Sequence, residues 1–170
     1  MPQYEINVVE QVPLGDAALA QRLVEAAERV CAYHHLAAQT GMSIVITDDK
    51  TVQGLNRQYR QVDAPTDVLS FPTGDTAPTP EGEAPYLGDL LLALPYIERQ
   101  AAREGHRVAD ELMLAVVHGT LHLLGYDHDT ADHQSAMWTV QRDLLQALGV
   151  SIVVPEYDFP PDEDGSELAL

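Results

Sequence analysis

The chain has 170 residues, 45% of them hydrophobic, which is the size of one domain with enough apolar side chains for a core. Its 27 Asp and Glu residues outweigh 9 Lys and Arg residues, and the formal net charge of −18 opposes nonspecific attachment to a polyphosphate such as DNA. No apolar run reaches the roughly 18 residues of a membrane span, and the first residues resemble no signal peptide, so we expect a cytoplasmic protein without membrane contact.

The first part of the chain alternates between strand-like and helix-like patterns. Tyr4, Ile6 and Val8 alternate with polar neighbours, which is the period of a half-buried strand. Asp16 can cap the helix that follows, and a β-branched run after Gly41 favours a second strand. The expected order is a strand at residues 4–10, a helix at 17–38, a strand at 42–47, a helix at 50–59 and a strand between Pro65 and Pro72.

The second part combines a loop, an apolar strand and three helices. Residues 73–85 contain three prolines and two glycines, which predict a mobile loop. Residues 86–94 are almost continuously apolar, as in a strand covered on both faces, and Pro95 suits the first turn of the next helix. We expect two further helices, from about residue 108 into a histidine-rich stretch and from about residue 131 to Gly149, and then a disordered acidic tail at 158–170.

The histidine-rich stretch, HGTLHLLGYDH at residues 118–128, has the spacing of a metal site. If the first part of it is helical, His118 and His122 lie one turn apart on the same face. Gly125 can adopt the left-handed conformation that ends a helix, so the chain can bend and bring His128 back to the same ion. Three imidazoles with one position left open are the ligand set of a catalytic zinc rather than a structural one. The pattern therefore predicts one Zn²⁺ per chain, although imidazole ligands also accept nickel or copper.

The same spacing occurs in the zinc-peptidase signature H-E-x-x-H-x-x-G-x-x-H, whose glutamate is the general base. In this chain the position of that glutamate is occupied by Gly119. The metal ligands are retained while the general base is missing. A zinc metallopeptidase or related hydrolase therefore stays an alternative, although it would lack the glutamate that activates water.

Three blocks of the sequence resemble the YbeY family, the bacterial metal-dependent endoribonucleases that mature ribosomal RNA. The blocks are HGTLHLLGYDH at 118–128, LNRQYRQVDAPTDVLSFP at 55–72 and YLGDLLLAL at 86–94. The resemblance implies an α/β (α+β) fold, with helices packed on a small mixed β-sheet of about four strands and a metal at the mouth of a cleft. We expect this single catalytic domain to cover residues 1–157.

The resemblance also implies a function and a set of site residues. It implies cleavage of single-stranded stretches of ribosomal RNA, with rRNA and the small ribosomal subunit as partners. Its zinc ligands fall on His118, His122 and His128, and its arginine implicated in activity falls on Arg60. We expect Arg60 and His118 to be catalytic, because a guanidinium beside the metal can stabilise charge that develops on a phosphate. Whether the zinc activates water or polarises a phosphoryl oxygen stays open.

Four more residues near these blocks are candidates for supporting roles. Arg57 and Ser70 are expected to bind substrate together with Arg60. Asp127 could orient an imidazole or simply close the turn before His128. Ser70 and Asp89 could line the cleft, with Asp89 beside the imidazoles, although hydrogen bonding at the strand ends explains both residues nearly as well. No general base is evident.

A non-catalytic ribosome-assembly factor with a structural metal is the alternative from another functional class. It would need a basic docking face, and the available arginines for such a face are Arg57, Arg60, Arg99 and Arg103.

Overall fold

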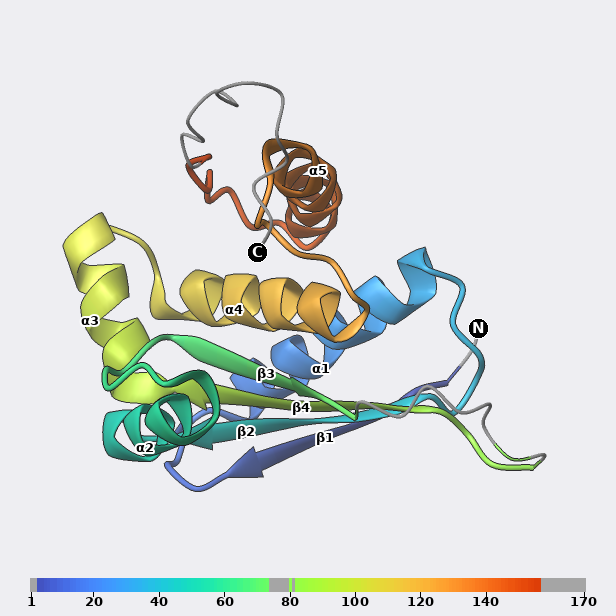
Figure 1. Cartoon of the computed structure of the whole chain (residues 1–170), viewed down its shortest axis with the longest axis horizontal. Helices are drawn as coiled ribbons and strands as arrows, with labels where there is room; N and C mark the ends of the chain where they lie inside the picture. The colour runs from blue at the N-terminus through green and yellow to red at the C-terminus, as the bar shows by residue number, and fades with distance from the viewer. Residues whose placement is uncertain (1–2, 74–79, 81, 157–170) are drawn as a thin grey trace.

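A four-stranded mixed sheet forms the base of the protein in its computed structural model (Figure 1). The strands β1 (Glu5–Glu10), β2 (Gly41–Thr47), β3 (Val68–Pro72) and β4 (Tyr86–Ala93) lie in the order β1-β2-β4-β3. The pairs β1·β2 and β2·β4 are parallel, whereas the edge strand β3 is antiparallel to β4. The expected mixed sheet of about four strands is therefore confirmed.

The structure describes residues 3–73, 80 and 82–156. Most of the predicted mobile loop at 73–85 and the whole predicted acidic tail at 158–170 lie outside these described residues. Within the described part, no helix is both long enough and apolar enough to pass through a membrane.

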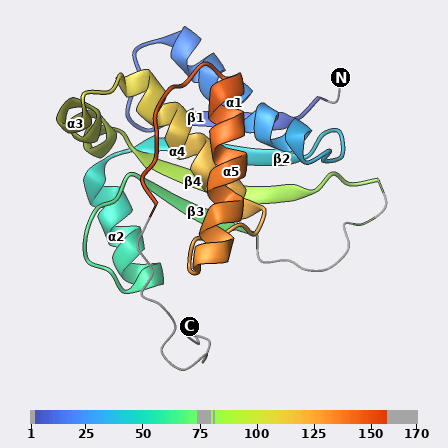
Figure 2. The same cartoon turned by 90° about the horizontal axis from the view of Figure 1, so that it is seen from above.

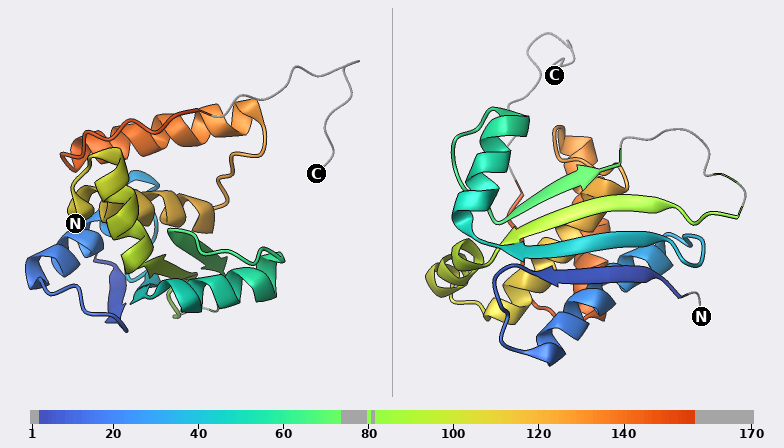
Figure 3. Two further views of the ribbon diagram at one scale, coloured as in Figure 1. Left: turned by 90° about the vertical axis from the view of Figure 1, so that its left-hand side faces the viewer. Right: turned by 90° about the horizontal axis from the view of Figure 1, so that it is seen from below.

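Five helices complete the described part of the fold, and α4 lies at its centre. Viewed from above, α5 crosses over α4, and α4 in turn lies on the sheet (Figure 2). Seen from below, the strands face the viewer and α1 and α5 lie behind them (Figure 3). The helices are α1 (Ala17–Tyr33), α2 (Asp49–Arg60), α3 (Leu94–Glu104), α4 (Val108–Leu123) and α5 (Ala131–Ala147).

The central position of α4 follows from its composition, because it is apolar around most of its circumference. It packs against α1, α3, α5 and the strands β3 and β4. Its buried side chains join the main core, and they include Leu112, Met113, Val116, Val117 and Leu121. Any side chain that this helix presents is consequently held on the best-packed element of the fold.

Helix α1 is shorter than expected, since it ends at Tyr33 and not near residue 38. His35 adopts a positive φ of 53°, and its amide bonds to Ala32 O while the Leu36 amide bonds to Cys31 O. This is the pair of hydrogen bonds that closes a helix in a Schellman motif. The sequence predicted too long a helix because a non-glycine residue occupies the left-handed position, where glycine is the usual signal for a helix end.

Candidate metal centre

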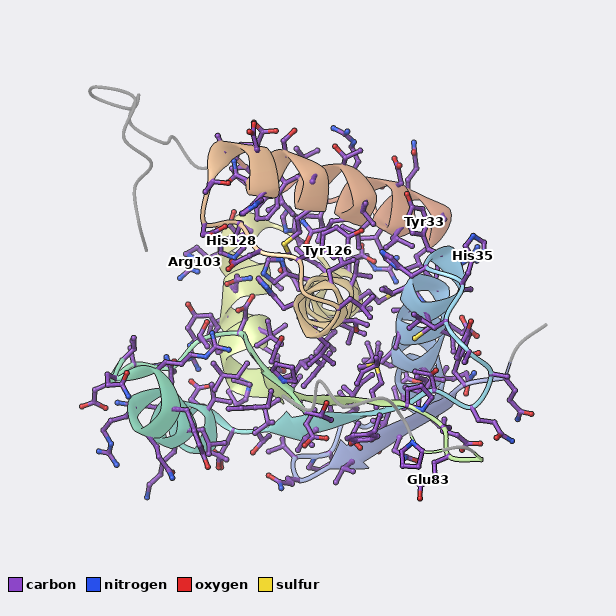
Figure 4. The ribbon with its side chains drawn as sticks, turned by 45° about the vertical axis from the view of Figure 1, so that its right-hand side comes forward. Tyr33, His35, Glu83, Arg103, Tyr126 and His128 are labelled. Carbon is purple, nitrogen blue, oxygen red and sulfur yellow. The ribbon has the colours of Figure 1, made fainter. Side chains whose placement is uncertain are left out.

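Three imidazoles converge where α4 ends. His118 and His122 lie on α4, and His128 lies on the loop that joins α4 to α5, where Figure 4 also shows Tyr126. One ring nitrogen from each histidine lies within 4.8 Å of the other two. The Nε2 atoms of His118 and His122 are 3.1 Å apart. Two nitrogens about 2.05 Å from a tetrahedral ion are about 3.3 Å apart, so this spacing fits zinc with little adjustment.

The chain bends after α4 as the glycine predicts. Gly125 has φ 97°, its amide bonds to His122 O, and the Tyr126 amide bonds to Leu121 O. These bonds form a second Schellman motif, and they turn the chain back towards α4. The Asp127 carboxylate then accepts a hydrogen bond from the backbone N–H of His128 at 2.7 Å, within the same turn.

Each helical histidine has its Nδ1 atom bonded away from the convergence point. His122 Nδ1 donates to the backbone oxygen of Tyr126 at 2.8 Å, and His118 Nδ1 lies 2.9 Å from Gln141 Oε1. A carbonyl oxygen can only accept, so the proton of each neutral ring is on Nδ1 and the lone pair is on Nε2. Both Nε2 atoms are therefore ready to bind a metal.

The acceptor for His122 is itself anchored to α1. The Tyr126 hydroxyl donates to His34 Nε2 at 2.9 Å, and His34 Nδ1 donates to Val30 O at 2.8 Å. The two rings also meet edge to face, with centroids 5.5 Å apart. The loop that carries His128 is thus tied to the last turn of α1.

Burial keeps the helical imidazoles neutral. Burial lowers the pKa of His118 from 6.5 to about 4, together with the neighbouring His122 and His128, and against the hydrogen bond that His118 donates to Gln141. Burial is also the main reason that the pKa of His122 is lowered. Since a histidine must be deprotonated to bind a metal, both rings are in the binding form at neutral pH.

Trp138 of α5 covers the cluster. Its ring meets those of His118 and His128 edge to face, with centroids 5.9 Å and 5.5 Å away. The indole is buried and packs in the main core, and its N–H donates to Pro155 O. This side chain excludes water from one side of the imidazoles, which strengthens electrostatic interactions there.

Gly119 has no room for a larger side chain. A Cβ built on it would lie 2.9 Å from Leu90 Cδ2 and 3.2 Å from Ser70 Oγ. The position faces the sheet, so a glutamate there would be forced into β3 and β4 and not towards the imidazoles. The missing base of the peptidase signature therefore has a packing explanation in this fold.

Ser70 connects the predicted arginine to the metal helix. Its backbone oxygen accepts a hydrogen bond from Arg60 Nη2 at 3.0 Å, and its buried hydroxyl donates to Gly119 O at 3.1 Å. The charge of Arg60 contributes to the lowered pKa of His122, so the guanidinium lies within electrostatic reach of the imidazoles. The Ser70 hydroxyl, which we expected to bind substrate, is turned into α4.

The structure does not bring Asp89 to the imidazoles. Successive residues of a strand point to opposite faces, and Leu90, the residue after Asp89, lies against Gly119 of α4. The Asp89 carboxylate instead accepts the Tyr86 hydroxyl, which also bonds to Ser43, on the other face of the sheet. Arg57 is exposed on α2, one turn before Arg60.

Sequence reasoning missed three contributors to this site: Gln141, Trp138 as a cover and the His34–Tyr126 pair. Gln141 had a detectable signal, because it is a polar residue within the apolar stripe of α5 between Met137 and Leu145. The His34–Tyr126 contact spans 92 positions of sequence and had no local signal.

Comparison with known proteins agrees with this geometry. The family model described as "Endoribonuclease YbeY" matches residues 6–149. A protein of that name from Pelotomaculum thermopropionicum is 40% identical over 152 residues, covering 89% of this chain and 99% of its own length. Another from Moorella thermoacetica is also 40% identical, covering 85% of this chain and 95% of its own. A solution structure from Thermotoga maritima shares the fold at 24% identity, with a TM-score of 0.59 over 84% of this chain and 88% of its own. This chain belongs to the endoribonuclease YbeY family.

Proposed function

We propose that the protein is a zinc-dependent endoribonuclease that cuts single-stranded stretches of ribosomal RNA in the cytoplasm. The observation that supports this most is the convergence of three imidazoles beside Arg60 in a chain of this family. The relatives are named as endoribonucleases, which agrees with a phosphodiester substrate. Three protein ligands leave one tetrahedral position for solvent or substrate, as in catalytic zinc sites.

In this proposal the three histidines would bind the ion and an arginine would bind the phosphate. His118, His122 and His128 would hold the zinc, which when bound supplies Lewis acidity for phosphate chemistry. Arg60 would pair with the scissile phosphate, because a guanidinium stays charged and presents two parallel donors to phosphate oxygens. Its hydrogen bond to Ser70 O fixes where that charge stands relative to α4. Trp138 would keep bulk water from the covered side.

The cleavage assay compares four zinc-loaded proteins on single-stranded and double-stranded rRNA fragments. Wild type should cut the single-stranded fragment. Arg60→Ala should lose at least about 100-fold in rate, as expected for removal of a transition-state contact, and His128→Ala should lose at least as much because it removes a metal ligand. Arg103→Ala is the control, because that arginine is exposed on α3 and pairs with Glu104. Equal cleavage by wild type and both site variants, or no cleavage by any, would overturn the proposal.

For partners, we propose rRNA within the small ribosomal subunit, contacted through a narrow basic patch of Arg57 and Arg60. Two of the four arginines of the basic face named above already pair with carboxylates: Arg99 forms a salt bridge with Asp49, and Arg103 lies 4.0 Å from Glu104. We therefore leave these two out of the patch. With so few phosphate contacts on a chain of net charge −18, binding should depend only weakly on salt.

Cosedimentation with small subunits tests this patch. The double variant Arg57→Glu/Arg60→Glu should lose binding, and Arg99→Glu/Arg103→Glu should retain it. The opposite result would place the contact on α3. If the protein were an assembly factor with a structural metal, the Arg60→Ala variant would bind small subunits normally. The wild-type protein would then show no metal-dependent cleavage.

A further inference from the structure

We propose that Gln141 of α5 is a positioning residue for the metal, because it holds His118 in the tautomer whose Nε2 atom faces the ion. This inference rests on the proposed function only in requiring that the three histidines bind zinc. Gln141 is 1% exposed, and its Oε1 atom lies 2.9 Å from His118 Nδ1. It acts through His118 and has no described contact with the convergence point itself.

The need for Gln141 follows from where His118 lies. His122 is in the last turn of α4, so its Nδ1 atom can use the backbone oxygen of Tyr126 after the bend. His118 lies one turn earlier, where the carbonyls point along the helix axis and are bonded to helical amides. In the structure the acceptor for its Nδ1 proton comes from another element, namely Gln141 of α5.

The identity of residue 141 supports this role over simple packing. Its neighbours on the buried side of α5 are apolar, namely Met137, Leu144 and Leu145. A buried amide in such a stripe costs free energy unless it is hydrogen-bonded, and a leucine or methionine would fill the space without that cost. Within the described residues no fully buried side-chain nitrogen or oxygen lacks a partner, so the amide is satisfied in place.

The geometry also sets the direction of the hydrogen bond. A zinc ion held by His118 Nε2 leaves the ring proton on Nδ1, and the Gln141 oxygen is the group that accepts it. The pairing makes α5 a part of the metal centre, in addition to the cover that Trp138 provides from the same helix.

The test measures zinc affinity and the state of the His118 ring, without any RNA. The variants are Gln141→Met, which keeps the volume but removes the acceptor, and Gln141→Glu, which keeps an acceptor. Gln146→Met makes the first change at an exposed position of α5 and is the matched control. Zinc affinity is read by competition with a chromophoric chelator, and the His118 Nδ1–H signal by NMR of ¹⁵N-labelled, zinc-loaded protein.

We expect Gln141→Met to weaken zinc binding by about 10- to 100-fold, the usual effect of removing such an outer partner. Its His118 Nδ1–H signal should exchange with water much faster than in wild type. Gln141→Glu should stay within about threefold of wild-type zinc affinity, because a carboxylate oxygen can accept the hydrogen bond from His118 Nδ1 in place of the amide oxygen. Gln146→Met should match wild type in both measurements.

Several results would overturn the proposal. One is an unchanged zinc affinity and an unchanged Nδ1–H signal in Gln141→Met. Another is an equal loss in Gln141→Glu and Gln141→Met, which would indicate packing alone. A third needs no variant: zinc-loaded wild type with no protected Nδ1–H on His118, and this also decides the case if Gln141→Met does not fold. Failure of wild type to cut RNA would defeat the proposed function and leave these measurements valid.

Discussion

The two histidines of α4 and the histidine of the following loop reach the same point by different means. His118 and His122 sit on a buried helix, and their Nδ1 atoms are bonded to Gln141 and to the Tyr126 backbone. His128 arrives after the Gly125 bend, on a segment closed by Asp127 and tied to α1 through His34.

This difference indicates that the site is preset on one side and adjustable on the other. The helical pair is spaced for a tetrahedral ion by the helix that carries it, so binding there costs little ordering. The loop histidine must be held in place against more conformational freedom, and part of its interaction with a metal offsets that entropy. Variants of the two sides should therefore differ in size of effect.

The largest effect on zinc affinity should come from two single variants, one that removes a helical ligand and one that removes the loop ligand. Structural zinc sites bind with about 10–16 kcal/mol over four ligands, which is about 100- to 1,000-fold in affinity per ligand. We expect His122→Ala to lose about 1,000-fold in zinc affinity and His128→Ala about 100-fold, because part of the loop ligand's contribution is spent on ordering. Isothermal titration or chelator competition measures both, with the exposed His35→Asn as control. An equal or greater loss in His128→Ala would show that the loop is as preset as the helix.

The next effect concerns the packing beneath the helical pair. Gly119→Glu should lower the free energy of unfolding by about 4 kcal/mol, because its side chain meets Leu90 and Ser70 and buries a carboxyl group without a partner. The matched control is Gly54→Glu on α2, where an added Cβ meets nothing within 4 Å. That variant should be neutral or slightly stabilising, since glycine is a poor helix former. Urea unfolding of the metal-free proteins measures both, and similar values for the two would mean that α4 can move off the sheet.

The buried helical side should also make stability depend on pH in the metal-free protein. The pKa of His118 is about 4 in the folded state and near 6.5 in the unfolded chain, so between these values the unfolded chain binds the extra proton. Stability is fully present above about pH 6.5 and should fall by on the order of 3 kcal/mol as the pH drops to about 4.

Two histidine variants separate this contribution from other titrations. His118→Gln should show a smaller decrease between pH 6.5 and 4 in urea unfolding, with the lowered pKa of His122 accounting for part of what remains. His133→Gln should keep it, because Asp129 raises the pKa of that exposed histidine and its contribution has the opposite sign. A wild-type slope in His118→Gln would show that the ring is not held neutral by burial.

The same contrast separates what the sequence could predict from what it could not. The histidine spacing, the bend at Gly125 and the cap Asp16 are local features, decided within a few residues, and all three are as expected. The mixed sheet was also predictable, through the strand patterns and the family resemblance.

The residues that support the ligands depend on contacts between distant segments. Gln141 is 23 positions from His118, and His34 is 92 positions from Tyr126, so no spacing rule could pair them. Asp89 was misplaced for another reason: β4 is nearly continuously apolar, and such a run does not show which face each residue occupies. The end of α1 failed because His35 takes a backbone conformation that residue type does not announce.

The smallest predicted effect tests the tie between the loop and α1. Tyr126→Phe removes the hydroxyl that donates to His34 Nε2 but keeps the ring contact and the backbone oxygen that accepts His122 Nδ1. The loss of one hydrogen bond should cost about 1 kcal/mol, so zinc affinity should fall by about fivefold. Because the backbone acceptor remains, the effect should be smaller than that of Gln141→Met, which removes the acceptor itself. Chelator competition on both variants decides the order. A larger loss in Tyr126→Phe would mean that the anchor on α1, and not the burial of α4, sets the geometry of the site.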